Sequence, residues 1–188
     1  MLRAISTLII YVLFINTALA DDQLKQRAQK SKEVVMEFMN SLKGELETAI
    51  KAGGPANAIN VCHKQAPAIA KTLSDKYGWD IGRTSLKTRN PDNTPDEWEI
   101  KILNDFEARK TKGEDVKPMA YFAAVDNNGK KAFRFMKAIP TGEVCLKCHG
   151  TDIDPTIKAK LHELYPGDMA TGFKLGDIRG AFTISQPM

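Results

Sequence analysis

Hydrophobic positions in the first third of the chain recur every three or four residues, a spacing typical of helices. From Leu24 to Ile50 the apolar side chains share one face and the charged side chains share the other. Gly53-Gly54 ends this pattern, and Pro55 follows where the first turn of a new helix tolerates proline. The second helical pattern continues to about Tyr77. We therefore expect a long amphipathic helix followed by a shorter one.

The second helix contains a proline that predicts a local distortion. Within a regular helix, the ring of Pro67 would clash with the carbonyl of His63 and would remove one backbone hydrogen bond. We expect a kink just after Cys62, on the apolar stripe of this helix.

The second half of the chain carries strand patterns rather than helical ones. Asn128-Gly129 is a strong hairpin signal between two of them. The capping box Thr94-Pro95-Asp96-Glu97 predicts a helix that closes at Lys112-Gly113, and Asp154-Pro155 predicts a short helix ending near Tyr165. The predicted strands are residues 83–89, 119–125, 131–139 and 179–185. This order predicts an α+β fold with an antiparallel sheet and long N-terminal helices.

The first twenty residues have the features of a secretion signal. A positive start at Arg3 precedes a short apolar run, and Ala18-Leu19-Ala20 is a small-x-small cleavage site. An uncleaved anchor is the alternative, but the run is short for a span of about 20 residues. We expect residues 1–20 to be a signal peptide, residues 21–188 to be one domain in the periplasm, and no membrane span after cleavage.

Composition narrows the class of protein. The 188 residues are 43% hydrophobic and 27% charged, with a formal net charge of +4, which is ordinary for a globular domain. Basic and acidic residues alternate along the chain, so nucleic-acid binding is not expected. Three cysteines are too few for a disulfide framework.

The chain's clearest chemical signal is Cys145-Leu146-Lys147-Cys148-His149. Cys-x-x-Cys-His is the attachment site of haem c: two thiols three residues apart can add to two porphyrin vinyl groups, and the histidine then lies beneath the iron. The alternatives are a Cys145–Cys148 disulfide, a chance match, or a zinc site that includes Cys62. A zinc site is less favoured because adjacent Cys148 and His149 are poorly placed to bind one tetrahedral ion. We predict one covalent haem c.

The other axial ligand of the iron is less determined by the sequence. Cys62 is either a small buried hydrophobe or a thiolate ligand. His63 is the alternative, but it points about 100° away around the helix, so only one of the two can reach the iron. His162 is expected on an exposed face. The methionines that could serve by chemistry, but for which core or surface roles are expected, are Met119, Met136 and Met169.

Four stretches of the chain resemble a known bacterial family of haem-binding, sensor-like domains. They are residues 58–70, 89–99, 145–150 and 165–181, and the most specific reads Arg89-Asn90-Pro91-x-Asn93-x-Pro95-Asp96-x-Trp98-Glu99. The family includes a cyanobacterial c-type haem protein with a PAS-like sheet and haem ligated by cysteine and histidine. The resemblance implies a PAS-like sheet here, with His149 as proximal ligand and Cys62 as distal ligand.

These observations lead to a functional hypothesis. We expect a periplasmic monohaem c-type cytochrome that acts in one-electron transfer or redox poise and is not an enzyme; its redox partner is not indicated. The alternative is a haem-based sensor of redox state or of a diatomic gas such as nitric oxide. Many relatives are the outer part of a membrane-bound kinase or chemoreceptor, and this chain contains no such output domain. A sensor would therefore act through a separate partner protein.

Overall fold

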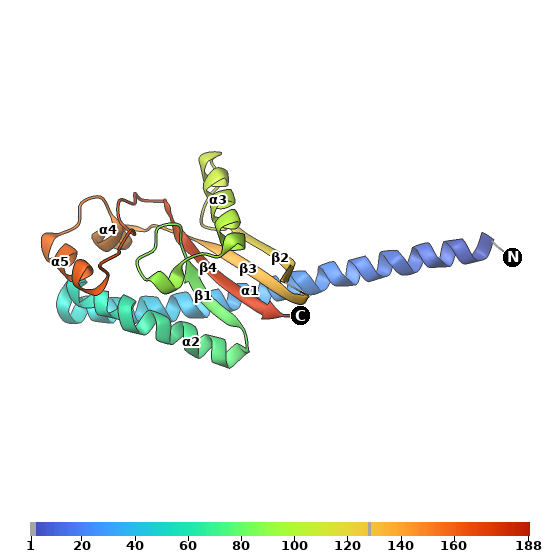
Figure 1. The fold of residues 1–188 in the computed structure, drawn as a ribbon, viewed down its shortest axis with the longest axis horizontal. Helices are drawn as coiled ribbons and strands as arrows, with labels where there is room; N and C mark the ends of the chain where they lie inside the picture. Colours follow the sequence, from blue (N-terminus) through green and yellow to red (C-terminus); the bar gives the residue numbers. More distant parts are fainter. Residues whose placement is uncertain (1–2, 128) are drawn as a thin grey trace.

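The computed structural model describes residues 3–127 and 129–188, except the side chains of residues 3–20 and 127. Helices form the N-terminal third and a four-stranded sheet forms the centre (Figure 1). The elements in order are α1 (Arg3–Asn60), η1 (Val61–Gln65), α2 (Ala66–Tyr77), β1 (Asp80–Thr84), η2 (Pro91–Asn93), α3 (Glu97–Thr111), β2 (Ala120–Asn127), β3 (Lys130–Pro140), α4 (Glu143–His149), α5 (Pro155–Leu164) and β4 (Ile178–Pro187). The predicted signal peptide covers residues 1–20. Residues 1–2 and the side chains of residues 3–20 lie outside this description.

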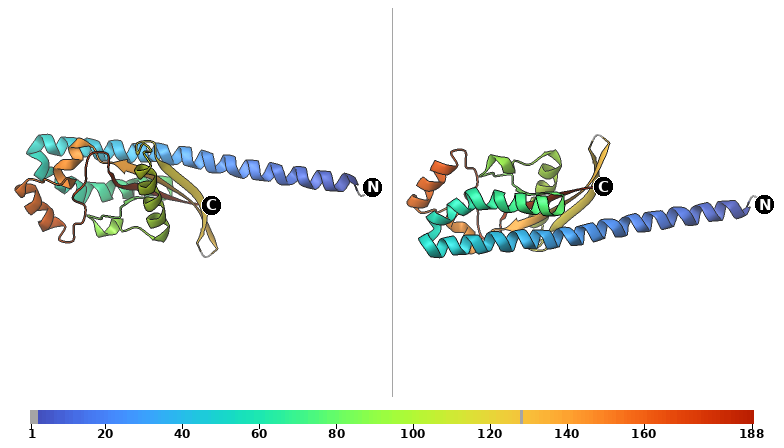
Figure 2. Two further views of the ribbon diagram at one scale, coloured as in Figure 1. Left: turned by 90° about the horizontal axis from the view of Figure 1, so that it is seen from above. Right: turned by 90° about the horizontal axis from the view of Figure 1, so that it is seen from below.

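The predicted break between the first two helices is confirmed. Within α1, Gly53 and Gly54 leave helical geometry, and Gly54 has a φ of 74°, a conformation that glycine adopts at little cost. The chain then resumes a helix at Pro55. Figure 2 shows α1 running the whole length of the molecule, with its N-terminal part projecting past the sheet.

At the position where a kink is expected after Cys62, the structure has a π-helical turn. In η1 the backbone N–H of Ala66 donates to the carbonyl of Val61, five residues earlier. Pro67 then lies in the first turn of α2, where its missing N–H costs nothing. The extra residue in the turn therefore removes the conflict that Pro67 would create in a regular helix.

The sheet is antiparallel throughout, with strand order β1-β4-β3-β2. The hairpin joining β2 and β3 is confirmed, with Asn127 opposite Lys130. The prediction of a strand over 83–89 is wrong in its bounds, because β1 spans Asp80–Thr84. The ladder stops after Thr84 because the Ser85 hydroxyl takes the place of a strand partner: it lies 3.0 Å from the Lys87 carbonyl and 2.8 Å from the Arg179 carbonyl.

The start of the third long helix also differs from the sequence prediction. The N-cap of α3 is Asp96 rather than Thr94: its carboxylate accepts from the Glu99 N–H at 2.8 Å, and the Glu99 carboxylate accepts from the Asp96 N–H at 3.1 Å. Thr94 instead donates its hydroxyl to the Pro91 carbonyl, closing η2. The sequence contains two overlapping capping-box patterns, Thr94-x-x-Glu97 and Asp96-x-x-Glu99. Because Thr94 is used to end η2, the second pattern caps α3.

Helices cover both faces of the sheet. On one face, Phe38 of α1 packs with Phe133 and Phe135 of β3; on the other, Phe106 of α3 packs with Met136 of the same strand. Consecutive strand residues point to opposite faces, so β3 supplies both cores. The α+β class with an antiparallel sheet and a long N-terminal helix is confirmed.

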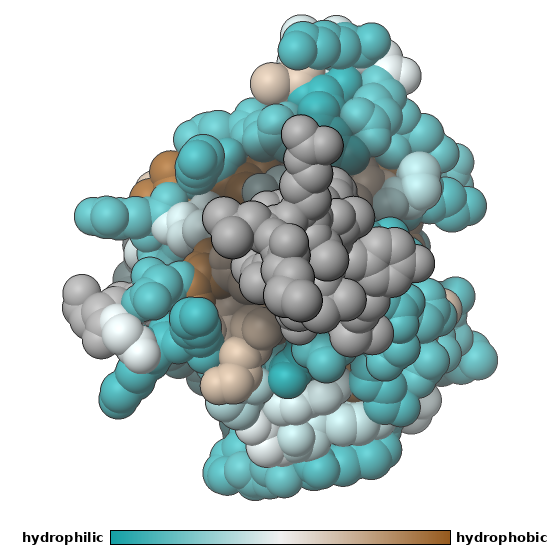
Figure 3. All heavy atoms as spheres, turned by 90° about the vertical axis from the view of Figure 1, so that its right-hand side faces the viewer, coloured by the Kyte–Doolittle hydropathy of each residue, from teal (hydrophilic) through white to brown (hydrophobic). Residues whose placement is uncertain are grey.

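Within residues 3–127 and 129–188, no helix combines the length and the apolar character needed to cross a bilayer. Viewed from the N-terminal end, the described surface is mainly hydrophilic, with small apolar areas beside α1 (Figure 3).

Candidate functional site

The Cys-x-x-Cys-His motif forms its own short helix, α4, which the sequence patterns did not predict. Cys145 and Cys148 are three residues apart, so both thiols lie on one face of α4, and both are half-buried. Gly150 ends the helix. A Cβ at this position would lie 2.5 Å from the carbonyl oxygen of Leu146, so only glycine fits there without a shift of the backbone.

A cavity lies between α4, α1 and the end of the sheet. Its empty space, including the open mouth, is about 1070 Å³. One wall is apolar and comes from successive turns of α1, with Leu42, Leu46 and Ile50. Cys145, Cys148 and His149 line the cavity from α4.

His149 is held in one orientation and kept neutral. Its Nδ1 lies 2.7 Å from the carbonyl oxygen of Ala170, and a proton donated there leaves the lone pair on Nε2. Burial, with the charges of Arg179 and Arg89, lowers the pKa of His149 well below its ordinary value. A neutral imidazole with a free Nε2 is the form that binds a metal ion.

Arg89 fixes the position of the motif. It forms an ion pair with Asp168 at 2.9 Å, and both side chains are almost fully buried. The same guanidinium donates to the carbonyl of Cys148 at 2.6 Å and to that of Ala170 at 3.3 Å. One side chain therefore ties the end of α4 to the loop that orients the imidazole of His149.

Cys62 faces the same cavity as the motif. It lies in η1 and lines the cavity together with Ala58 and Ile59 of the preceding turn. His63 is exposed, does not line the cavity, and packs edge-on against Tyr165 with ring centroids 5.2 Å apart. The structure therefore brings Cys62, and not His63, together with Cys145, Cys148 and His149.

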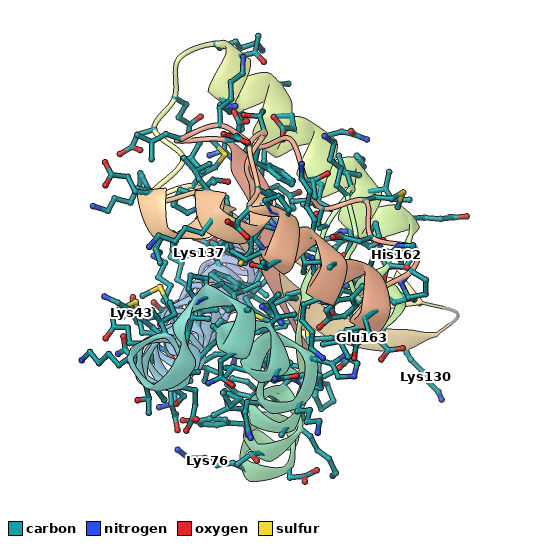
Figure 4. The ribbon with its side chains drawn as sticks, turned by 90° about the vertical axis from the view of Figure 1, so that its left-hand side faces the viewer. Lys43, Lys76, Lys130, Lys137, His162 and Glu163 are labelled. Atoms are coloured by element: carbon teal, nitrogen blue, oxygen red, sulfur yellow. The ribbon has the colours of Figure 1, made fainter. Side chains whose placement is uncertain are left out.

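The remaining candidate ligands lie elsewhere. His162 belongs to α5 and is exposed (Figure 4, which views the end of the molecule where α4 and α5 lie). Met119 and Met136 are buried in the core beneath α3, and Met169 is 55% exposed. None of these four side chains lines the cavity.

Two arginines at the cavity had no part in the sequence predictions. The Arg179 guanidinium lies beside the imidazole of His149, with Nε 3.2 Å from Nδ1, and burial lowers the pKa of Arg179 to about 10. Arg83 lines the cavity from β1, and burial lowers its pKa also. Arg179 lies within residues 165–181, one of the four stretches that resemble the family, and this resemblance could have pointed to it. Arg83 lies in none of the four stretches.

Fold and site together define the class: a small α+β domain in which a Cys-x-x-Cys-His helix faces an apolar cavity beneath a long N-terminal helix. The chain belongs to the Tll0287-like family, whose model, described as Tll0287, matches residues 21–187. That match begins directly after the predicted cleavage site. A solved structure, described as the cyanobacterial haem protein Tll0287, has a TM-score of 0.67 and 22% sequence identity, and the match covers 87% of this chain and 96% of that one. No curated protein matched the chain.

Proposed function

We propose that this protein is an exported c-type cytochrome that carries one covalent haem on Cys145 and Cys148. The observation that carries the proposal is the placement of both thiols and the imidazole of His149 on one cavity with an apolar wall. The similar solved structure is that of a haem protein, which supports the same conclusion.

The residues present fit such a cofactor. Each thiol can add its S–H across one vinyl group, and the shared face of α4 presents both thiols to the same edge of a porphyrin. His149 offers the lone pair of Nε2 to the iron, while the Ala170 carbonyl holds the ring by Nδ1. The side chains of α1 exclude water from one face. When bound, the haem supplies an iron atom that changes its charge by one electron.

Cys62 is the proposed distal ligand, and electron transfer or redox poise is the proposed activity. Among the described histidine, cysteine and methionine side chains, only Cys62 lines this cavity besides the three residues of the motif. Two protein ligands leave no open coordination position, so a carrier role is favoured over catalysis.

A haem-based sensor is the second candidate, and η1 is the observation that favours it. Cys62 is in a π-helical turn, a hydrogen-bond pattern less stable than the α-helix and frequent at functional sites. Such a turn can rearrange at low cost, so release of the thiolate would open a site for a diatomic gas. The signal would then pass to a separate partner protein.

The test of the main proposal is an intact-mass measurement. The full-length chain is expressed in a host with haem-maturation machinery, and the periplasmic protein is purified. We expect the mass of residues 21–188 plus one haem. Cys145→Ala/Cys148→Ala should give the bare chain, and Cys62→Ser should still carry haem. A wild-type mass equal to the bare chain, or two protons lighter as a disulfide, would rule out the proposal.

A further inference from the structure

Arg83 is a half-buried cation without an acceptor. It lines the cavity, and its guanidinium lies over the ring of Phe38, 5.7 Å from the centroid. Among the described residues, no carboxylate or carbonyl oxygen accepts a hydrogen bond from it. Even partial burial of an unpaired charge is costly, so a group that supplies the opposite charge is expected to bind there.

The neighbouring arginines are already occupied. Arg89 is paired with Asp168, and Arg179 donates to the hydroxyl of Ser85 at 3.1 Å and the carbonyl of Lys87 at 3.2 Å. Three guanidinium groups therefore line the cavity, and one of them is paired with a carboxylate. Arg83 is the member of the group whose donors are all still available.

Arg83 and Lys147 of α4 line different parts of the cavity. The contact of Arg83 on α1 is Phe38, whereas Lys147 of α4 lies beside Gly53 and Pro55 at the other end of that helix. Fifteen helical residues separate Phe38 from Gly53, a distance of roughly 22 Å along the axis. Leu42, Leu46 and Ile50 line the cavity between these two ends.

We propose that Arg83 binds a carboxylate of the cofactor, namely a propionate group of the haem. This inference rests on the proposed function. The vinyl groups and the propionates of haem are on opposite edges of the ring. Thioethers at Cys145 and Cys148 would therefore leave the propionates at the edge away from those two sulfur atoms, within the cavity that Arg83 also lines. The site thus selects a porphyrin that carries carboxylates, and a guanidinium is the side chain best suited to pair with them.

The test measures reversible binding of ferric haem and of its dimethyl ester, in which both propionates are neutral. Titrations of the haem absorption band use the full mature chain with Cys145→Ala/Cys148→Ala, so that no thioether forms. In this chain we expect Arg83→Gln to weaken binding of haem by about 10- to 100-fold, the value of a charge-assisted hydrogen bond, and to leave binding of the ester unchanged. Arg83→Lys should recover part of the affinity. Arg109→Gln, a matched change on α3, should alter neither.

The folding of the variant provides a second measurement. Without haem, Arg83→Gln should unfold at a temperature equal to or higher than the parent chain, because it removes an unpaired, half-buried charge. Equal losses of affinity for haem and ester would overturn the inference, because Arg83 would then be only structural. Unchanged binding of haem to Arg83→Gln would also overturn the inference. The proposed function would still stand in either case if the wild-type protein carries the mass of one haem. If neither porphyrin binds and no haem mass is found, both proposals are wrong.

Discussion

Cys62 and His63 are consecutive residues, yet their surroundings give them different chemistry. Cys62 lines the same cavity as His149, while His63 is exposed and contacts Tyr165. Helical geometry alone shows that the two cannot face the same way. It does not show which one faces inward, because that depends on how η1 packs against the rest of the molecule.

Cys62→Ser should change the iron and leave the attachment intact. A thiolate cancels the positive charge of ferric iron and so stabilises it, and its loss should raise the reduction potential. We expect the charge-transfer bands of a ferric thiolate to disappear in absorption spectra of the purified haem protein. The matched variant His63→Ala should keep both the bands and the potential. The reverse pattern would assign the ligand to His63.

The attachment residues were predictable from sequence, and the polar residues around them were not. Cys145, Cys148 and His149 form a local pattern whose spacing itself carries the chemistry. Arg83 and Arg179 are single basic residues in strand patterns. Their importance arises because β1 and β4 pair and bring both guanidinium groups to the cavity, and no local pattern records that pairing.

Among the elements, helix starts were predicted less accurately than the helices themselves. The helix that contains Trp98 was expected and is present, but its cap is Asp96, since η2 occupies the residues before it. The strand expected over 83–89 begins and ends earlier for a similar reason: a side-chain hydroxyl, that of Ser85, replaces a ladder bond. Competition between local side-chain and backbone hydrogen bonds moves boundaries without changing element types.

Asp96→Ala should lower the free energy of unfolding by about 1–2 kcal/mol, because it removes the cap of α3. The same carboxylate also pairs with Arg134 at 2.6 Å, which adds to the loss. Thr94→Ala, two residues away, should cost less, since Thr94 caps no long helix. Urea unfolding of the two variants measures the difference. A larger loss for Thr94→Ala would mean that the helix begins earlier in solution.

The turn before β4 should be sensitive to acid. Although burial opposes it, the hydrogen bond from Lys110, at 2.5 Å, and that from the Lys174 N–H, at 2.7 Å, lower the pKa of Asp177. A carboxyl whose pKa is lower in the folded state stabilises the fold above its unfolded pKa, and this contribution is lost as the pH falls through the folded pKa.

We therefore expect Asp177→Asn to reduce stability near neutral pH and to flatten the loss of stability between about pH 5 and pH 2. Urea unfolding at a series of pH values measures this slope. Asp75→Asn is the control, because its ion pair with Lys71 is on the exposed face of α2 and contributes little. Parallel slopes for the wild type and Asp177→Asn would contradict the prediction.

At the scale of the whole molecule, α1 joins the sheet to the cavity. Phe38, which is 1% exposed, packs edge-on against Phe182 of β4 with ring centroids 5.3 Å apart, and it also lies beneath Arg83. The C-terminal end of β4 is held to the same helix, since Gln186 donates to the hydroxyl of Ser31 at 2.8 Å. The first and last parts of the domain thus stabilise each other.

Phe38→Ala should cost about 3–5 kcal/mol of unfolding free energy, because it opens a cavity in the core between α1 and the sheet. Met39→Ala, at the next position but 39% exposed, should cost less than about 1 kcal/mol. Chemical denaturation monitored by circular dichroism measures both. Similar losses for the two variants would show that α1 is not packed on the sheet as described.

The presence of Cys62 and His149 at one cavity has a consequence for the whole chain. The two residues are 87 positions apart in the sequence and line the same cavity. A metal bond to both would act as a cross-link that closes this loop in the unfolded chain. By the chain-entropy relation for a loop of that length, the closure is worth about 4.6 kcal/mol. If the bond to Cys62 depends on the oxidation state of the iron, that oxidation state would determine whether residues 62–149 are cross-linked in the unfolded chain, and so how much entropy this segment has.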